Sequence, residues 1–169
     1  PKDEIKRQCY EEGKNKLLAQ GYHEIGMDHF ALESDWLYQS FQAGTLHRNF
    51  MGYTASKTQV MIGLGISSIS DSWYSFAQNE KKLEDYYARL ENNELPVYRG
   101  HILSAEDLMI RRHILNLMCS FQTSWADPSM QFPELAEVLG QLEEMRDDGL
   151  LEIGPHSIRV TEQGKAFVR

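Results

Sequence analysis

Apolar and polar residues follow one another in the first part of the chain in a way that predicts helices separated by short strands. Residues 2–20 carry apolar side chains at near-helical spacing, with Lys, Glu and Gln between them, and Gly21 follows as a helix stop. Residues 22–30 are short, mixed and flanked by glycine, which predicts a buried strand that opens into a loop. This order of helix, glycine and strand is typical of an α/β layer.

The next segments continue the mixed pattern. Residues 34–42 predict a helix whose apolar side includes Trp36. Residues 46–54 interleave basic, polar and aromatic side chains around a glycine. Residues 60–70 predict an apolar strand, and glycines that permit close backbone approach or positive φ interrupt it at Gly63 and Gly65.

The second half of the chain has a different pattern. After Asp71 the strand-like segments stop, and amphipathic helices are expected at residues 80–91, 104–118 and 133–149. Ser104 begins a sequence that resembles a capping box. The change of pattern predicts an α/β domain over residues 1–72 and a mainly α domain over residues 73–169.

The tail of the chain predicts a β-hairpin and a last short helix. Residues 150–153 and 157–160 flank the turn sequence Gly-Pro-His, and Thr161 can cap a helix that runs to Phe167. Helices followed by a hairpin and a short terminal helix give a winged-helix-like layout. A regulatory module that binds DNA is therefore one interpretation of this half.

Charge argues against nucleic acid as a partner. The net charge of the 169 residues is −8, which repels phosphate backbones and anionic membrane surfaces. The candidate recognition helix, residues 133–150, carries a single arginine, Arg146, among many acidic side chains. A DNA-reading helix would be basic, so we favour a packing module within an enzyme.

Composition places the protein among cytoplasmic globular proteins. The apolar share of 41% supports a real core, and the sequence has no apolar run near the roughly 20 residues that cross a bilayer. Cys9 and Cys119 lie far apart without a metal-binding spacing, so we expect free, reduced thiols. The chain opens with Pro1 in what reads as the middle of a helix, so we expect a fragment of a longer protein.

Two clusters of polar residues are candidates for chemistry. Asp28 and His29 stand where a strand is expected to end, which is where active sites gather in parallel α/β layers. The alternative is a capping aspartate beside a half-exposed histidine. His47 and Arg48 precede Phe50, and they suit carboxylates beside a flat ring; the alternative is a surface loop with ordinary salt bridges.

Three segments together resemble a known family. Residues 24–31, 46–54 and 63–70 read EIGMDHFA, LHRNFMGYT and GLGISSIS, and smaller matches lie at residues 77–79 and 98–100. Their order and spacing resemble the C-terminal portion of oxygen-independent coproporphyrinogen III oxidases. The related radical-SAM haem chaperones typically carry different residues at the first two segments, so the oxidase branch is favoured over a chaperone.

The resemblance implies a reaction and a set of partners. The full enzyme is expected to hold a 4Fe–4S cluster and S-adenosylmethionine in a partial (β/α) barrel, of which this chain would supply the end, and to act as a monomer with an electron donor. It would oxidatively decarboxylate two propionates of coproporphyrinogen III to vinyl groups, giving protoporphyrinogen IX for haem synthesis.

The resemblance also implies site residues. Phe50, Met51 and Ile69 match positions of the S-adenosylmethionine pocket, although the family often has Gln where this chain has Met51. Asp28 and His29 are candidate pocket or substrate residues because of their place at a strand end, and His47, Arg48 and Arg99 are candidates because their charge would complement porphyrinogen carboxylates.

The cluster-binding motif C-x3-C-x2-C is missing from this sequence, and two distant cysteines cannot replace it. The cluster ligands are thus absent from this chain. We therefore expect this chain alone to be inactive and free of iron.

Overall fold

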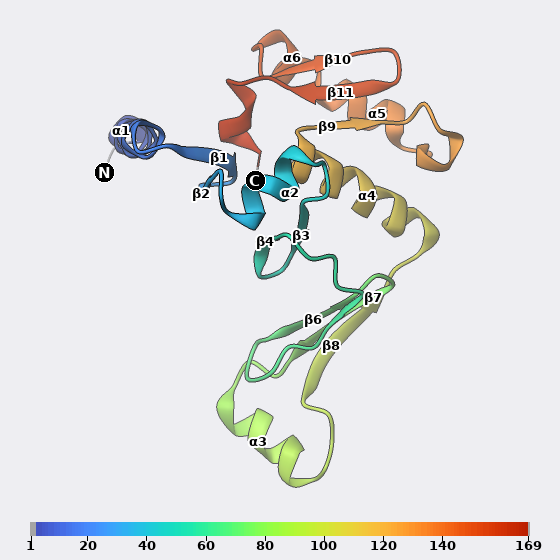
Figure 1. Cartoon of the computed structure of the whole chain (residues 1–169). Helices are drawn as coiled ribbons and strands as arrows, with labels where there is room; N and C mark the ends of the chain where they lie inside the picture. Colours follow the sequence, from blue (N-terminus) through green and yellow to red (C-terminus); the bar gives the residue numbers. More distant parts are fainter. Residues whose placement is uncertain (1–2, 169) are drawn as a thin grey trace.

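The first helix lies where the apolar spacing predicts it. In the computed structural model, which describes residues 3–168, α1 spans Asp3–Ala19 and is followed by Gly21 at φ +83°. None of its residues is buried. Figure 1 shows α1 at one side of the molecule, and β1 connects it to the rest.

The strand predicted over residues 22–30 is an antiparallel hairpin of β1 (Tyr22–Gly26) and β2 (His29–Leu32). Met27 and Asp28 form its turn with φ values of 39° and 62°. Two-residue hairpin turns favour positive φ at both positions, usually supplied by Asn, Asp or Gly. Because Met27 is an unusual residue for such a turn, the sequence did not signal it, and the pairing seen here is antiparallel where parallel strands were expected.

A small core lies beneath this hairpin. Ile25, Ala31 and Leu46 are buried, and side chains of α2 (Trp36–Gln42) pack against them. Trp36 itself is 77% exposed, contrary to the expectation that it lies on the apolar side. It is the first residue of a helix only seven residues long, and the packing side chains come from its middle and end.

A second hairpin and a four-stranded sheet follow. The hairpin consists of β3 (His47–Asn49) and β4 (Gly52–Thr54). The sheet is antiparallel throughout, in the order β5 (Val60–Met61), β6 (Ile69–Ser72), β7 (Ser75–Asn79) and β8 (Val97–Ile102). The helix α3 (Leu83–Glu91) connects the last two strands and lies at the far end of the sheet in Figure 1.

The sheet corrects two expectations. The single strand predicted over residues 60–70 is two short strands separated by an irregular loop. Strands also continue after Asp71, although an end to strand-like segments was predicted. The reason is that β7 and β8 mix apolar and polar residues without a period of two, and every residue of β8 after Val97 is exposed. They therefore lack the apolar alternation that identifies a half-buried strand.

The long helix α4 (Ala105–Ser120) joins the sheet to the C-terminal part (Figure 1). The capping box predicted at its start is present, since Ser104 and Asp107 exchange hydrogen bonds. A short strand, β9 (Gln122–Ser124), follows and was not predicted. The helix predicted over residues 133–149 is two helices that meet at Leu142, α5 (Leu135–Gln141) and α6 (Glu143–Asp147).

The predicted C-terminal hairpin is confirmed. β10 (Leu151–Ile153) pairs with β11 (Ser157–Val160), and β9 adds a third strand on the other side of β11. The 3-10 turns η1 (Pro128–Met130) and η2 (Gly164–Phe167) complete this part. Its core contains Trp125, Leu151 and Ile158.

The fold is thus a mixed α/β arrangement of antiparallel hairpins and sheets. Its pairings over residues 3–168 close no barrel. The four-stranded sheet draws strands from both sides of position 72, and the division of the chain there stays a prediction. Within the same residues, no helix is long and apolar enough to span a bilayer.

Candidate functional site

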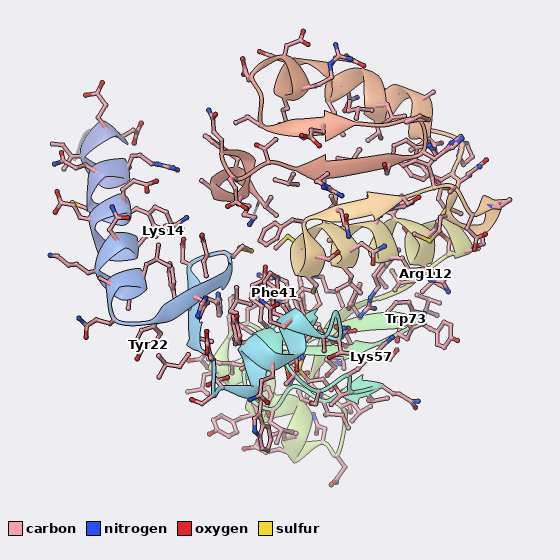
Figure 2. The ribbon with its side chains drawn as sticks, turned by 45° about the horizontal axis from the view of Figure 1, so that its top comes forward. Lys14, Tyr22, Phe41, Lys57, Trp73 and Arg112 are labelled. Carbon is pink, nitrogen blue, oxygen red and sulfur yellow. The ribbon has the colours of Figure 1, made fainter. Side chains whose placement is uncertain are left out.

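A cleft of about 910 Å³ lies between the four-stranded sheet and α4. The loop after β4, the turn between β6 and β7, and the middle of α4 form its walls. Figure 2 shows Lys57, Trp73 and Arg112 on the same side of the molecule, each from one of these segments. The remaining polar lining comes mainly from His47, Asn49, Asp71, Tyr74, Arg111 and Asn116.

An ion pair fixes the inner wall of the cleft. Arg111 Nη2 lies 2.8 Å from Asp71 Oδ1, and both side chains are largely buried. Arg111 Nη1 also donates to the carbonyl oxygens of Ser72 and Trp73, at 2.8 and 3.2 Å. The guanidinium lies over the rings of Trp73 and Phe76, with its Cζ 4.8 and 4.9 Å from their centroids. Arg111 therefore ties α4 to the β6–β7 turn.

His47 is buried at the base of the cleft. Burial lowers the pKa of its imidazole, the nearby positive charges of Lys57 and Arg111 lower it further, and Asp71 opposes them. His47 is therefore held in its neutral form at neutral pH. A neutral imidazole can donate and accept one hydrogen bond each, but it offers no fixed charge to a ligand.

Two of the three residues predicted for S-adenosylmethionine, Phe50 and Ile69, lie on one face of the four-stranded sheet. Ile69 and Asp71 point to one face because they are two residues apart in β6, and Phe76 is paired opposite Asp71. The ring of Phe50, at the tip of the β3–β4 hairpin, contacts Phe76 edge-on with centroids 5.1 Å apart. The structure thus brings Phe50 and Ile69 to the same face.

The tip of this hairpin is open. Phe50 is 54% exposed and Met51 is 84% exposed. Asn49 Oδ1 accepts a hydrogen bond of 2.8 Å from the Met51 backbone N–H, which fixes the turn. We call residues 50–52 the hairpin tip. At this tip, the aromatic ring of Phe50 and the flexible thioether of Met51 are both accessible to solvent.

Arg48 points away from the cleft, because neighbouring residues of a strand face opposite sides. Its Cζ lies 4.8 Å from the centroid of the Tyr53 ring, and its buried Nη1 has no hydrogen-bond partner among the described residues. Tyr53 donates from its hydroxyl to the Met118 carbonyl oxygen at 2.7 Å, and burial raises its pKa. Burial likewise raises the pKa of the Cys119 thiol to about 11. The structure therefore separates Arg48 from its predicted companion His47.

Asp28 and His29 lie at a hairpin turn instead of a parallel strand end. Asp28 lines a separate hollow of about 270 Å³ with Tyr10, Glu24 and Lys165. His29 Nδ1 is 2.8 Å from the Met27 carbonyl oxygen, and its ring meets Tyr53 edge-on at 5.1 Å. His29 is therefore placed beside the second hairpin, near Gly52, while Asp28 is not.

The loop between β5 and β6, residues 62–68, contains Gly63 and Gly65. From the sequence, close packing was one of the possible roles of these glycines, and the structure shows such packing. A Cβ on Gly63 would come within 2.8 Å of the Ile69 carbonyl oxygen. The buried side-chain amide of Asn79 donates to the carbonyl oxygens of Gly63 and Gly65, at 3.1 and 2.9 Å. The loop is therefore held closely against the end of β6.

Two further groups have structural roles. The buried ring of His113 has Nδ1 2.8 Å from Thr123 Oγ1 and Nε2 2.8 Å from the Met130 carbonyl oxygen. Arg146, the arginine of the candidate recognition helix, forms ion pairs with Glu143 and Asp147. Its charge is thus neutralised within its own helix, and the expected acidic character of this segment holds.

The cleft was missed at the sequence level, because its residues come from positions far apart in the chain. Lys57, Trp73 and Arg111 belong to no common motif, and the sequence carries no signal that links them. For metals, residues 3–168 contain no group of three or more His, Cys, Asp or Glu side chains arranged as ligands. Cys9 is exposed and Cys119 half-buried, and both are free thiols.

Comparisons with known proteins point to one family. The family described as "HemN C-terminal domain" matches residues 103–167. An oxygen-independent coproporphyrinogen III oxidase of Pseudomonas aeruginosa is 36% identical over 159 residues, which are 91% of this chain and 35% of that protein. One from Thermostichus vulcanus is 38% identical over 160 residues, which are 91% of this chain and 49% of that protein.

One solved protein structure is similar to this chain over its whole length. It is the coproporphyrinogen III oxidase (HemN) from Escherichia coli, described as a radical SAM enzyme. The TM-score is 0.91 at 34% identity, and the match covers 100% of this chain and 40% of that one. The chain thus spans between about a third and a half of the length of these relatives.

Proposed function

The chain corresponds to the C-terminal region of the oxygen-independent coproporphyrinogen III oxidases, and on this premise we propose that it forms one side of the active site of such an enzyme. The full-length protein would decarboxylate two propionates of coproporphyrinogen III to vinyl groups, giving protoporphyrinogen IX. The observation that carries the proposal is the hairpin tip, where Phe50 is exposed on the same sheet face as Ile69.

We propose that this face contacts S-adenosylmethionine. An exposed aromatic ring suits stacking on a flat base, and an aliphatic edge suits the methionine chain. Met51 would act through its backbone, since its thioether offers only a weak acceptor where an amide could donate. S-adenosylmethionine, when reduced, supplies the radical; the residues of this chain orient it and exclude water.

The cluster is expected elsewhere in the full-length enzyme. Two free cysteines on separate elements cannot hold a 4Fe–4S cluster. We propose that its ligands lie in the portion of the enzyme that this chain does not span, and that this chain alone is inactive. Iron analysis of the purified chain tests this, and a stoichiometric iron content would contradict it. An electron donor, a monomeric full-length enzyme and a cytoplasmic location stay predictions.

The remaining candidate residues lie in different places, so we propose a different role for each. His29 would lie beside the cofactor face, because it borders Gly52 of the hairpin tip. Arg48 would hold the ring of Tyr53 in place, since its guanidinium packs on that ring, and the Tyr53 hydroxyl donates to the Met118 carbonyl oxygen of α4. His47 would line the cleft as a neutral group, and Asp28 is the weakest candidate because its hollow is separate.

The test uses the full-length enzyme that carries this chain, reconstituted with iron and sulfide without oxygen. It is supplied with coproporphyrinogen III, S-adenosylmethionine and a reductant, and the porphyrin products are separated by chromatography. Formation of protoporphyrinogen with consumption of S-adenosylmethionine supports the oxidase. Haem binding without decarboxylation would contradict it and favour a haem chaperone.

A further inference from the structure

Positive charge gathers in the cleft beside α4 although the chain as a whole is acidic. The net charge of the chain is −8, yet the cleft is lined by Lys57, Arg111 and Arg112 against a single carboxylate, Asp71. Since like charges repel, such a cluster is costly unless something compensates it. Asp71 compensates one of these charges, through Arg111.

The other two cations are available to a ligand. The guanidinium of Arg111 donates its hydrogen bonds to Asp71 and to the carbonyl oxygens of Ser72 and Trp73. Over residues 3–168, neither Lys57 nor Arg112 has a carboxylate within ion-pair distance, and both side chains are exposed at the cleft. They come from opposite walls, the loop after β4 and the outer side of α4, and Figure 2 shows Trp73 between them.

The surface between the two cations is aromatic and apolar. Lys57 Nζ lies 5.7 Å from the centroid of the Trp73 ring, and Tyr74 beside it is 65% exposed. Val60, Met61 and Leu115 also line the cleft. A volume of about 910 Å³ is within the range of sites for drug-sized molecules. This arrangement fits a molecule with a large apolar body and carboxylates at its rim.

Resting on the proposed function, we propose that the cleft binds the tetrapyrrole, with Lys57 and Arg112 holding the carboxylates of propionates that do not react. Only two propionates of the substrate would become vinyl groups. The others enter and leave the reaction as anions, so they need cations outside the reacting centre. Binding energy from such remote groups can orient the reacting ones.

The position of the cleft suits this role. Phe76 contacts the ring of Phe50 on the cofactor face, and Arg111 of the cleft lies over the same Phe76 ring. Phe76 therefore contacts one residue of the cleft, Arg111, and one residue of the hairpin tip, Phe50, so the two regions are neighbours. A tetrapyrrole anchored in the cleft would extend toward the hairpin tip without occupying it.

The experiment compares charge removal inside and outside the cleft, in the full-length enzyme. The probe is coproporphyrin III, the stable oxidised porphyrin with the same carboxylates, and its fluorescence reports binding. Lys57→Gln and Arg112→Gln are each expected to weaken binding roughly fivefold, as loss of a partly exposed charge contact does. The same variants should raise KM for coproporphyrinogen III while leaving KM for S-adenosylmethionine unchanged.

Two controls separate this role from a general effect of charge. Lys81→Gln removes a positive charge from the loop after β7, outside the cleft lining, and should leave porphyrin binding unchanged. Lys57→Arg keeps the charge and should restore binding. Higher salt should weaken binding of the wild type more than that of the double variant Lys57→Gln/Arg112→Gln, because salt screens the charge contacts that only the wild type makes.

The outcomes distinguish this proposal from the proposed function. If the wild type forms protoporphyrinogen but the double variant binds coproporphyrin III as tightly, the cleft proposal is overturned and the oxidase stands. If the wild type forms no protoporphyrinogen but binds the porphyrin in a manner that depends on Lys57 and Arg112, the cleft proposal stands and the reaction is overturned.

Discussion

The cleft and the hairpin tip meet at Phe76, whose ring contacts Arg111 of the cleft and Phe50 of the tip, but the two regions differ in how this chain holds them. The cleft is walled by segments from the hairpin, the sheet and α4, and a buried ion pair holds them together. The hairpin tip leaves Phe50 and Met51 exposed. The difference indicates that cleft residues contribute to the stability of this chain itself, whereas the tip residues act only where another surface meets them.

The largest effect is expected from breaking the ion pair in the cleft. Arg111→Ala leaves the Asp71 carboxylate buried without its partner, which typically costs about 3–5 kcal/mol. The free energy of unfolding of this chain, measured by urea denaturation with circular dichroism, should fall by about that amount. Asp71→Ala should show a strong coupling to Arg111→Ala in a double-mutant cycle, because the two groups contact each other.

The matched control is Arg146→Ala in α6. Arg146 also forms ion pairs, with Glu143 and Asp147, but they are exposed. Exposed pairs contribute less than about 1 kcal/mol. Equal losses of stability in the two variants would mean that the cleft pair is not a structural link, and the contrast between cleft and tip would fail.

A smaller loss is expected from the loop that contains Gly63 and Gly65, between β5 and β6. Gly63→Ala places a Cβ 2.8 Å from the Ile69 carbonyl oxygen, and overpacking of this kind costs about 1–3 kcal/mol. Gly13→Ala is the control, because the new methyl group meets only open space in α1. It should raise stability by about 0.5–1 kcal/mol. Thermal unfolding of both variants checks this. If Gly63→Ala leaves the stability unchanged, the loop can shift to accommodate the new methyl group, and the predicted close packing is wrong.

These sites also show what the sequence could predict. The C-terminal hairpin and the capping box at Ser104 were found because their signals lie within a few neighbouring residues. β8 was missed because its mostly exposed residues mix apolar and polar side chains without alternation. Phe50 and Ile69 were proposed only through resemblance to a family, and their role stays a prediction, whereas Lys57 and Arg112 carry no local signal and come to one cleft only in the folded chain.

A pH effect of moderate size is expected at the base of the cleft. The pKa of folded His47 is below its ordinary value, so the unfolded chain binds more protons as the pH falls through about 6.5. The stability that neutral His47 provides is therefore present above this pH and is lost as the pH falls toward the lowered pKa. Lys57 and Arg111 enlarge the effect, and Asp71 reduces it.

The variant His47→Asn should flatten this dependence in urea titrations at pH values on both sides of about 6.5. His156→Asn is the comparison, since His156 is exposed in the turn of the C-terminal hairpin. If His47→Asn keeps the full acid sensitivity of the wild type, the imidazole is not the group that burial holds neutral.

The smallest effect on stability is expected at the hairpin tip, and it should come with a large effect on activity. Phe50→Ala and Met51→Gln change exposed side chains, so each should alter the free energy of unfolding of this chain by less than about 0.5 kcal/mol. In the full-length enzyme, Phe50→Ala should raise KM for S-adenosylmethionine, since a stacking ring contributes about 1–3 kcal/mol by analogy with aromatic contacts to bases. Met51→Gln supplies an amide donor and should leave that KM equal or lower. If Phe50→Ala instead unfolds the chain and leaves KM unchanged, the tip is part of the core, and the contrast with the cleft is wrong.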